Sequence, residues 1–565
     1  MYGFLIVEED SGIRLKKGRK IISGGFTFLY HPLPKFENDK LFYEDDKKVV
    51  LLDGAIINNQ ELIQEYGCKT WRETFDMLVL KHPSSFMDHL RGPFCGLVLQ
   101  KNTKKMIAFT NHLGEKTVYY TKVNGKILIA SHCNYIHSYC KRIGVRLEPC
   151  IQSMYDLLGN GAILNAKTPF QGIYRVTGGK RLIYSDGETN TEWYHLFHNI
   201  PEHELTLDEC IDRGDRLFRQ AIDRIFSKNE EYGYKTECDL SGGLDTRMNA
   251  WVAHDLGFQN VLNVCYSRKG SLDWKASKKI AEELGNEYFF YPLDGKLVED
   301  VDRKVDLFGG QVEYAISSGS VQALESVGYD DIGICCMGLM GELQNGYWVE
   351  GEEHTSAKFM TRWRKCHVHP ICVPDHYAED FDNFEQMNLY EYSAAAFQLS
   401  AVARQQMCET ASPFADPDYL DFIYKVPLKW RRNYKYVMEW MKTKYPHSAD
   451  FVWQHTGRPV NEEKGLKHYI FHKALSVANI VVYHFNKFTI HNGVHLSLIQ
   501  KKDMTPLSAW YSRSKRMRDF LQSYYDKNIN WVKDMKLKKD IKTEFEDGGI
   551  EGKIEAINIL VLCKV

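Results

Sequence analysis

A pair of adjacent glycines, with the segments on either side of it, constrains the fold of this 565-residue chain more than any other feature. The residues before it, Thr236 to Leu240, are typical of a short strand, and those after it, from about Arg247 to Leu256, are typical of an apolar helix. Gly242 and Gly243 lie at the junction, where glycine permits close backbone approaches that other residues do not. The sequence therefore predicts a loop at the carboxyl end of a strand, where open α/β sheets bind ligands.

The pattern around this loop extends the prediction to a whole sheet. From about residue 205, helical segments alternate with short apolar strands, which is typical of a parallel sheet flanked by helices. Besides the two segments above, we expect helices at Leu207–Phe226 and Trp274–Leu284 and strands at Val261–Tyr266, Tyr288–Pro292 and Ile332–Cys336. The four expected strands and their helices form an open α/β unit.

The remainder of the second half is expected to be mainly helical. After about residue 355 the expected helical segments are Glu391–Met407, Tyr419–Tyr424 and Lys435–Lys444. Residues 501–550 carry mixed Lys, Arg, Asp and Glu, which favours solvated helix faces over a patch for nucleic acid or membrane.

The first 190 residues have a different pattern, with short alternating segments bounded by Gly, Asn, Asp and Lys. The expected strands are Gly3–Val7, Gly25–Tyr30, Val49–Leu52, Cys95–Gln100, Met106–Thr110, Thr117–Thr121 and Ile127–Ser131. The chain is too long for a single hydrophobic core, so this sheet-rich part is expected to be a separate domain.

Composition excludes several classes of partner. The formal net charge is only −2, so no global field favours nucleic acid or an anionic membrane. The N-terminal residues lack the features of a signal peptide, and no stretch approaches the length of a membrane span. We therefore expect a soluble, cytoplasmic protein, with a homodimer as one option for its oligomeric state.

The 14 cysteines have no CxxC spacing, which favours reduced core residues over a disulfide framework. One short tract, Cys366-His367-Val368-His369-Pro370-Ile371-Cys372, offers four potential zinc ligands. Its spacing does not match that of a zinc finger or ribbon, so we favour a structural or incidental role for it over metal binding.

The glycine loop carries the chemistry of an anion site. Gly242 and Gly243 allow backbone N–H groups to approach phosphate oxygens, and the following helix contributes its positive dipole end. Ser241 and Thr246 add hydroxyl donors, whereas Asp245 would repel phosphate unless a divalent cation such as Mg²⁺ lay between them. The alternative is a tight strand-to-helix turn capped by Asp or Ser.

The segment Ser241-Gly242-Gly243-Leu244-Asp245-Thr246 resembles the SGGxD[ST] pyrophosphate loop (PP-loop) of ATP pyrophosphatases, which favours the nucleotide site. Around it, most of the chain resembles the asparagine synthetase family. In the first half the resemblance lies in Leu52–Asn58, Arg91–Phe94, Asn111–Tyr120, Ala130–His132, Pro169–Ile173 and Trp193-Tyr194, in the family's order.

The resemblance implies two domains. Residues 1–200 would form an Ntn-type, sheet-rich αββα domain like a class II glutaminase, and residues 205–565 a parallel-sheet PP-loop domain of the adenine nucleotide α-hydrolase type with helical extensions. Working glutaminases of this class have a cysteine at residue 2 as nucleophile, but this chain has Tyr2. An asparagine that stabilises the oxyanion is replaced by Asp53, whose carboxylate would repel it. We therefore expect no glutamine hydrolysis.

In the second half, the resemblance implies an ATP site and a metal pair. The implied ATP-binding residues are Leu240, Ser241, Gly242, Gly243, Leu244, Asp245, Thr246, Tyr266, Asp273 and Gly338, and the implied Mg²⁺ ligands are Asp245 and Glu342. Glu409–Asp416 resembles the family's ExRxPFxD segment, and Lys435 matches a later lysine. Arg458 is the nearest cation to the family's catalytic lysine, so the expected catalytic residues are Asp245, Glu342, Lys435 and Arg458.

Two departures concern the acceptor pocket: Leu339 stands where the family has a glutamate, and Ala411 where it has an arginine. The sequence thus predicts an ATP-dependent ligase that activates a carboxylate as an acyl-adenylate for attack by an amine or ammonia. Its substrates would be small-molecule or peptide carboxylates and amines, in natural-product, peptide or surface-polysaccharide modification. The alternatives are an ammonia-dependent asparagine synthase and a catalytically inactive nucleotide-binding scaffold.

Overall fold

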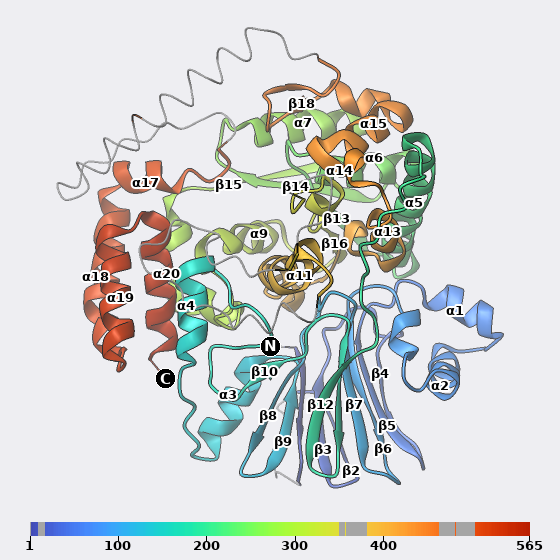
Figure 1. The fold of residues 1–565 in the computed structure, drawn as a ribbon, viewed down its shortest axis with the longest axis vertical. Helices are drawn as coiled ribbons and strands as arrows, with labels where there is room; N and C mark the ends of the chain where they lie inside the picture. The colour runs from blue at the N-terminus through green and yellow to red at the C-terminus, as the bar shows by residue number, and fades with distance from the viewer. Residues whose placement is uncertain are drawn as a thin grey trace.

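The structure is a computed structural model, and it describes residues 2–9, 17–349, 356–357, 381–462, 481 and 503–564. Figure 1 shows two stacked sheets at one end of the molecule and a further sheet with its helices at the other. The C-terminal helices form a group at the side, next to α4 (Ile151–Asn160). The chain is thus a mixed α/β protein with antiparallel sheets and a parallel sheet.

The two stacked sheets are antiparallel and have six strands each. The first has the order β10-β8-β9-β1-β3-β2, with β1 at Gly3–Val7, β2 at Arg19–Ser23, β3 at Phe26–His31, β8 at Tyr119–Val123, β9 at Lys126–Ala130 and β10 at Tyr174–Arg175. The second has the order β12-β11-β7-β6-β5-β4, with β4 at Leu41–Glu44, β5 at Lys48–Gly54, β6 at Phe94–Gln100, β7 at Lys105–Thr110, β11 at Lys180–Ser185 and β12 at Glu188–Trp193. All seven predicted strands are present, with ends shifted by up to two residues.

Apolar side chains on both faces of these strands form three apolar layers, because successive side chains point to opposite faces of a sheet. Phe28 of β3 and Leu97 of β6 belong to the cluster between the sheets. The outer face of the second sheet packs against α1 (Asn59–Tyr66) and α2 (Trp71–Lys81), and that of the first against α3 (Cys133–Arg142). The result is a four-layered helix–sheet–sheet–helix arrangement.

The parallel sheet has the order β15-β14-β13-β16-β17, with strands at Glu287–Pro292, Val261–Ser267, Lys235–Asp239, Ile332–Cys336 and Glu409–Ala411. The prediction of four strands is wrong by one, because β17 has only three residues and shows no alternation to detect. One face is covered by α5 (Leu207–Glu231), α6 (Asp245–Asp255) and α7 (Leu272–Leu284), and the other by α9 (Tyr314–Val327).

The segment before β17 departs from the predicted helix at Glu391–Met407. It consists of α11 (Phe384–Asn388), a π-helix at Leu389–Gln398, α12 (Leu399–Ala401) and a 3₁₀ turn at Arg404–Gln406. Apolar spacing predicts helical character but does not reveal where the hydrogen-bonding pattern changes. Beyond β17 lie α13 (Pro417–Ile423), α14 (Leu428–Arg431), α15 (Lys435–Lys444) and a hairpin of β18 (Val452–Trp453) and β19 (Arg458–Pro459).

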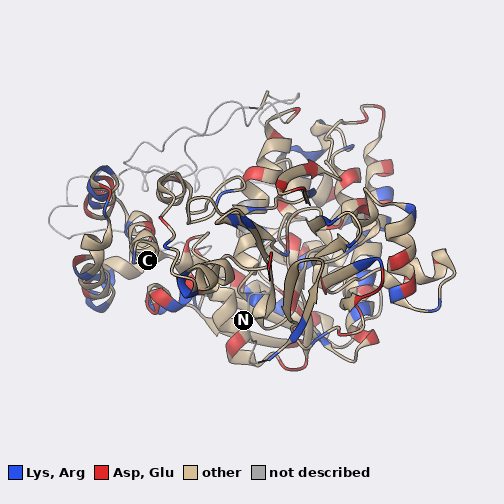
Figure 2. Ribbon diagram, turned by 90° about the horizontal axis from the view of Figure 1, so that it is seen from below, with Lys and Arg blue, Asp and Glu red and all other residues tan. Residues whose placement is uncertain are grey.

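The C-terminal helices are α17 (Leu507–Arg513), α18 (Lys515–Asn528), α19 (Met535–Asp547) and α20 (Ile550–Leu562). Their apolar faces share a core with α4 and with α8 (Val301–Leu307). Figure 2 shows basic and acidic residues interspersed on the helices near the C-terminus. Within the described ranges, no helix combines the length and apolar character needed to span a bilayer.

Candidate active site

The glycine loop lies between β13 and α6, near the middle of the parallel sheet. Two backbone N–H groups of the loop donate hydrogen bonds to hydroxyl side chains at the same strand-to-helix junction. The Ser241 N–H donates to Thr246 Oγ1 and the Gly243 N–H donates to Ser241 Oγ, each at 3.0 Å. These contacts place two hydroxyls and two backbone donors around the first turn of α6. Such a grouping at a helix N-terminus favours an anionic ligand.

Asp273 and the β18–β19 hairpin hold the other side of this loop. The Gly242 N–H donates to Asp273 Oδ1 at 3.1 Å, and the Gln454 N–H donates to the Gly242 carbonyl oxygen at 3.0 Å. A Cβ added at Gly242 would lie 2.8 Å from that of Gln454. Glycine is therefore required here by close packing.

Two half-buried carboxylates lie together beside the loop. Asp245 begins α6, and Glu342 lies in α10 (Gly341–Gln344), which follows β16. A Cβ on Gly341 would be 2.3 Å from Asp245 Cγ, so glycine lets this segment approach the carboxylate. Glu342 Oε1 is buried with no hydrogen-bond partner.

The electrostatics of this pair favour a cation. Burial raises the pKa of Asp245 to about 6. Burial also raises the pKa of Glu342 to about 7, and the charge of Asp245 adds to that rise. In the part of the chain that the structure describes, neither carboxylate forms a salt bridge with Lys or Arg. The pair could therefore hold a divalent cation, since hard cations take carboxylate oxygen ligands.

The other residues expected at an ATP site flank the same loop. Leu240 and Leu244 are buried in the core beneath it. The Tyr266 hydroxyl donates to Asp239 Oδ2 at 3.5 Å, at the end of β13. A Cβ on Gly338 would lie 2.7 Å from Thr246 Cγ2, so this glycine packs directly against the loop.

The two cations expected to assist catalysis are occupied elsewhere. The Lys435 ammonium lies 4.2 Å from the centroid of the Trp430 ring, and Arg458 pairs with Glu462 at 3.3 Å. Within the described residues, neither forms an ion pair with the two carboxylates. The segment carrying Lys435 does approach them, because the charges of Asp245 and Glu342 contribute to the raised pKa of Tyr434, after burial as the main cause.

Two site residues were missed by the sequence reasoning. Gln344 Nε2 donates to Asp245 Oδ1 at 3.2 Å and so orients that carboxylate. Arg404 is buried and pairs with Asp239 at 2.9 Å and with Glu237. The two acids alternating within an apolar strand, Glu237 and Asp239, were a signal that a buried cation must face them.

One pocket of the N-terminal half is lined by Tyr2 and Asp53, the two positions at which the resemblance implies that glutaminase residues are replaced. The Tyr2 N–H donates to Gln406 Oε1 at 2.8 Å, across the boundary with the second half of the chain. Asp53 accepts from Tyr30 at 2.7 Å and from Lys116 Nζ at 2.8 Å. Burial alone would raise the pKa of Asp53, but the charges of Lys116 and Lys40 lower it to about 2. Residue 53 is thus a charged hydrogen-bond acceptor.

The Cys366–Cys372 tract lies outside the described residues.

Comparison with known proteins gives a family model and curated relatives that are amidases or asparagine synthetases. Residues 34–138 match a family model described as a glutamine amidotransferase domain. The amidase chyE of Penicillium rubens is 28% identical over 175 residues, which cover 30% of this chain and 25% of the amidase. The glutamine-hydrolysing asparagine synthetase of Triphysaria versicolor is 25% identical over 294 residues, covering 49% of this chain and 44% of the synthetase. The matches therefore span less than half of each relative.

A solved glutamine phosphoribosylpyrophosphate amidotransferase from B. subtilis has 12% identity and a TM-score of 0.24, over 51% of this chain and 74% of that chain. A TM-score this low does not indicate a shared fold. By the family model and the curated relatives, the chain resembles the asparagine synthetase family.

Proposed function

We propose that this protein is an ATP-dependent ligase that activates a carboxylate as an acyl-adenylate and couples it to an amine or ammonia. In this proposal residues 205–565 form the PP-loop ligase domain. Residues 1–200 form an Ntn-type glutaminase-like domain without glutaminase activity. The relatedness to asparagine synthetases and amidases supports an amide-forming or amidotransferase type of reaction.

The observation that carries the proposal is the half-buried pair of Asp245 and Glu342 beside the glycine loop. An unpartnered buried carboxylate oxygen on Glu342 is unfavourable unless a cation or a hydrogen-bond donor meets it. The two residues fit Mg²⁺, which is commonly held by one or two carboxylates together with substrate phosphates. When bound, Mg²⁺ would offset the negative charge of the triphosphate.

The roles of the chain's own groups follow from their positions. Ser241, Gly243 and Thr246 would hold the β- and γ-phosphates, exchanging their mutual hydrogen bonds for phosphate oxygens. A substrate carboxylate attacks the α-phosphorus, forming a mixed anhydride with AMP and releasing pyrophosphate. An amine then attacks the acyl carbon, giving the amide, AMP and a proton. Fixing both reactants at one sheet edge supplies the positioning that such a transfer needs.

The N-terminal pocket supports the absence of glutamine hydrolysis. Tyr2 offers a phenol in place of a thiolate, and Asp53 offers an ionised oxygen where a donor would be needed. Cys95 also lines this pocket, but burial raises the pKa of its thiol well above the usual range. A buried thiol with a raised pKa is a poor nucleophile.

The test is carboxylate-dependent exchange of labelled pyrophosphate into ATP, across a panel of acids that includes aspartate. ATP binding and glutamine hydrolysis are followed in parallel. Asp245→Asn and Glu342→Gln should abolish exchange. Asp156→Asn, which changes a buried aspartate paired with Lys167 at 3.4 Å on α4, is the matched control.

Exchange that persists in Asp156→Asn and disappears in both site variants would support the ligase. Exchange with aspartate, followed by asparagine formation from ammonia, would identify the asparagine synthase alternative. ATP binding without exchange for any acid would refute the ligase and favour the nucleotide-binding scaffold.

A further inference from the structure

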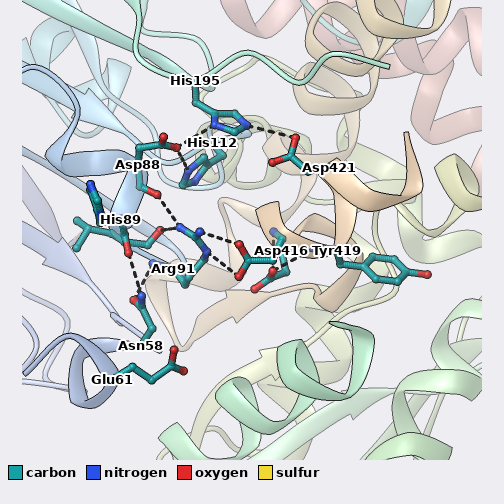
Figure 3. A network of polar contacts seen from close by, with 12 residues as sticks. Asn58, Glu61, Asp88, His89, Arg91, His112, His195, Asp416, Tyr419 and Asp421 are labelled. Carbon is teal, nitrogen blue, oxygen red and sulfur yellow. Dashed lines mark hydrogen bonds and ion pairs between the residues drawn. The ribbon is translucent and has the colours of Figure 1, made fainter. Parts of the chain in front are cut away.

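Two histidines and an aspartate, from three separate loops, meet away from the residues proposed for catalysis. Asp88 lies in the 3₁₀ turn Phe86–His89, His112 follows β7 and His195 follows β12. Asp88 Oδ1 is 3.1 Å from His112 Nε2 and 2.9 Å from His195 Nδ1. Figure 3 shows both rings directed at this carboxylate. The three ligand atoms lie within 4.8 Å of one another.

This cluster is incompletely satisfied as a hydrogen-bond network. If both rings donate a hydrogen bond to Asp88, His195 carries a proton on Nδ1. Its Nε2 is then either an unprotonated nitrogen of a neutral ring or a protonated nitrogen of a cationic ring. That nitrogen is buried with no hydrogen-bond partner, and it faces Asp421 Oδ1 at 4.0 Å. A neutral ring would therefore place a lone pair opposite a carboxylate.

A metal ion at the centre of the cluster removes this conflict. His195 would coordinate through Nδ1, and its single proton would move to Nε2, where Asp421 could accept it. A carboxylate behind a ligating histidine is a common arrangement, because it fixes the tautomer and ring orientation. His112 is buried as well, and its Nε2 already lies 3.1 Å from the same carboxylate oxygen.

We propose that Asp88, His112 and His195 bind a first-row divalent cation, with Zn²⁺ the best match, and that Asp421 is a positioning residue behind His195. Two imidazoles and one carboxylate are nitrogen and oxygen ligands suited to zinc. Ligands at ~2.0–2.1 Å in a tetrahedron are about 3.3 Å apart, so the two Asp88–histidine separations of 2.9 and 3.1 Å need to widen only slightly. The two ring nitrogens lie within 4.8 Å of each other and would adopt the same spacing. Water would complete the coordination.

The position of the site gives it a structural role. Asp88 and His112 lie at the end of the antiparallel sheets, whereas Asp421 is on α13, beyond the parallel sheet. Nearby, Arg91 bridges the same two parts through a bidentate contact with Asp418, at 2.8 and 3.2 Å. The cation would thus fasten α13 to the N-terminal sheets.

The test is binding of Zn²⁺ by the full chain after removal of bound metal with a chelator and dialysis. Competition with a chromogenic chelator gives stoichiometry and affinity. His195→Gln removes a ligand, and Asp421→Asn weakens the support behind it. His198→Gln is the matched control, because His198 forms an exposed pair with Asp382 at 3.1 Å outside the cluster. Cys366→Ser/Cys372→Ser separates the site from the Cys/His tract.

We expect one high-affinity zinc per chain in the wild type, the His198 variant and the double serine variant. Affinity should fall at least tenfold in Asp421→Asn, within the 10–100-fold range of such supporting residues, and further in His195→Gln. Co²⁺ should give a tetrahedral absorption band that these two variants weaken or lose, a readout that the loss of packing or hydrogen bonding alone would not change.

Asp88→Asn guards against a folding artefact, because it retains an oxygen acceptor for the histidines while removing the charge. Zinc affinity should still fall in this variant while its circular dichroism matches the wild type. The proposal is overturned if wild type takes up no zinc, or if the Asp88 and His195 variants bind it as tightly as wild type.

Discussion

Replacing Lys116 by Met should destabilise the junction between the two halves of the chain. The Lys116 ammonium contacts Asp53 at 2.8 Å and Glu409 at 3.0 Å, and none of the three side chains is more than 8% exposed. Asp53 lies near the end of β5 in the N-terminal sheets, whereas Glu409 begins β17 in the parallel sheet. One lysine thus neutralises carboxylates from two different sheets.

The expected magnitude follows from burial and from the charges left behind. Without Lys116, Lys40, which lies 3.3 Å from Glu409, is left to offset both Asp53 and Glu409, so one buried negative charge is uncompensated. Breaking a buried ion pair by removing one partner costs about 3–5 kcal/mol. The Asp53→Asn/Lys116→Met double variant should recover much of this loss, because the substituted amide is neutral and Lys40 still pairs with Glu409.

Amide hydrogen exchange with mass spectrometry is the suitable assay, because it reports local opening of β5 and β17 separately. At ~1.4 kcal/mol per tenfold, Lys116→Met should increase the opening constant more than a hundredfold. Lys122→Met is the control, since Lys122 and Glu188 form a surface pair at 3.2 Å that is expected to contribute only about 0–1 kcal/mol. If both variants exchange alike, the buried Lys116 cluster does not stabilise the junction.

The pH dependence of stability gives a second test of the Asp53 ion pair. The pKa of Asp53 in the folded protein is about 2, below its ordinary value of 3.8. A depressed carboxyl pKa contributes stability above the unfolded value, and this contribution is lost as the pH falls from about 4 through 2. At ~1.36 kcal/mol per pKa unit, the shift corresponds to about 2 kcal/mol. Wild type should lose this amount relative to Asp53→Asn over that range, and parallel pH profiles would contradict the linkage.

Three further changes test other parts of the structure. Gly341→Ala should abolish pyrophosphate exchange, because its Cβ would lie 2.3 Å from Asp245 Cγ; unchanged exchange would show that the Asp245 position does not matter. Arg404→Gln should destabilise the parallel sheet by about 3–5 kcal/mol in hydrogen exchange, because two buried carboxylates lose their cation, and a change below ~1 kcal/mol would disprove that role. Thr206→Ala should cost about 1 kcal/mol in thermal or urea unfolding by removing the capping box of α5, whereas no change would mean that the cap contributes nothing.

Local patterns predicted much of the fold because their causes are local. The strand before the glycine loop and the helix after it follow from apolar spacing and from the glycines between them. The three-residue β17 did not follow, because its place in the sheet comes from pairing with β16. The changes between α-helix, π-helix and 3₁₀ turn in the segment before β17 also depend on what that segment packs against.

The sequence by itself determined the antiparallel strands, the strand–loop–helix unit and the chemical character of the Ser241–Thr246 loop, because each depends on neighbouring residues. Only the tertiary structure decided which distant groups meet: Gln344 on Asp245, Arg404 on Asp239, and His195 on Asp88. The physical reason is that a buried charge or imidazole can be satisfied by any residue that the fold brings within a few ångströms. Sequence separation does not limit which residue that is, so the partner cannot be predicted from the order of residues alone.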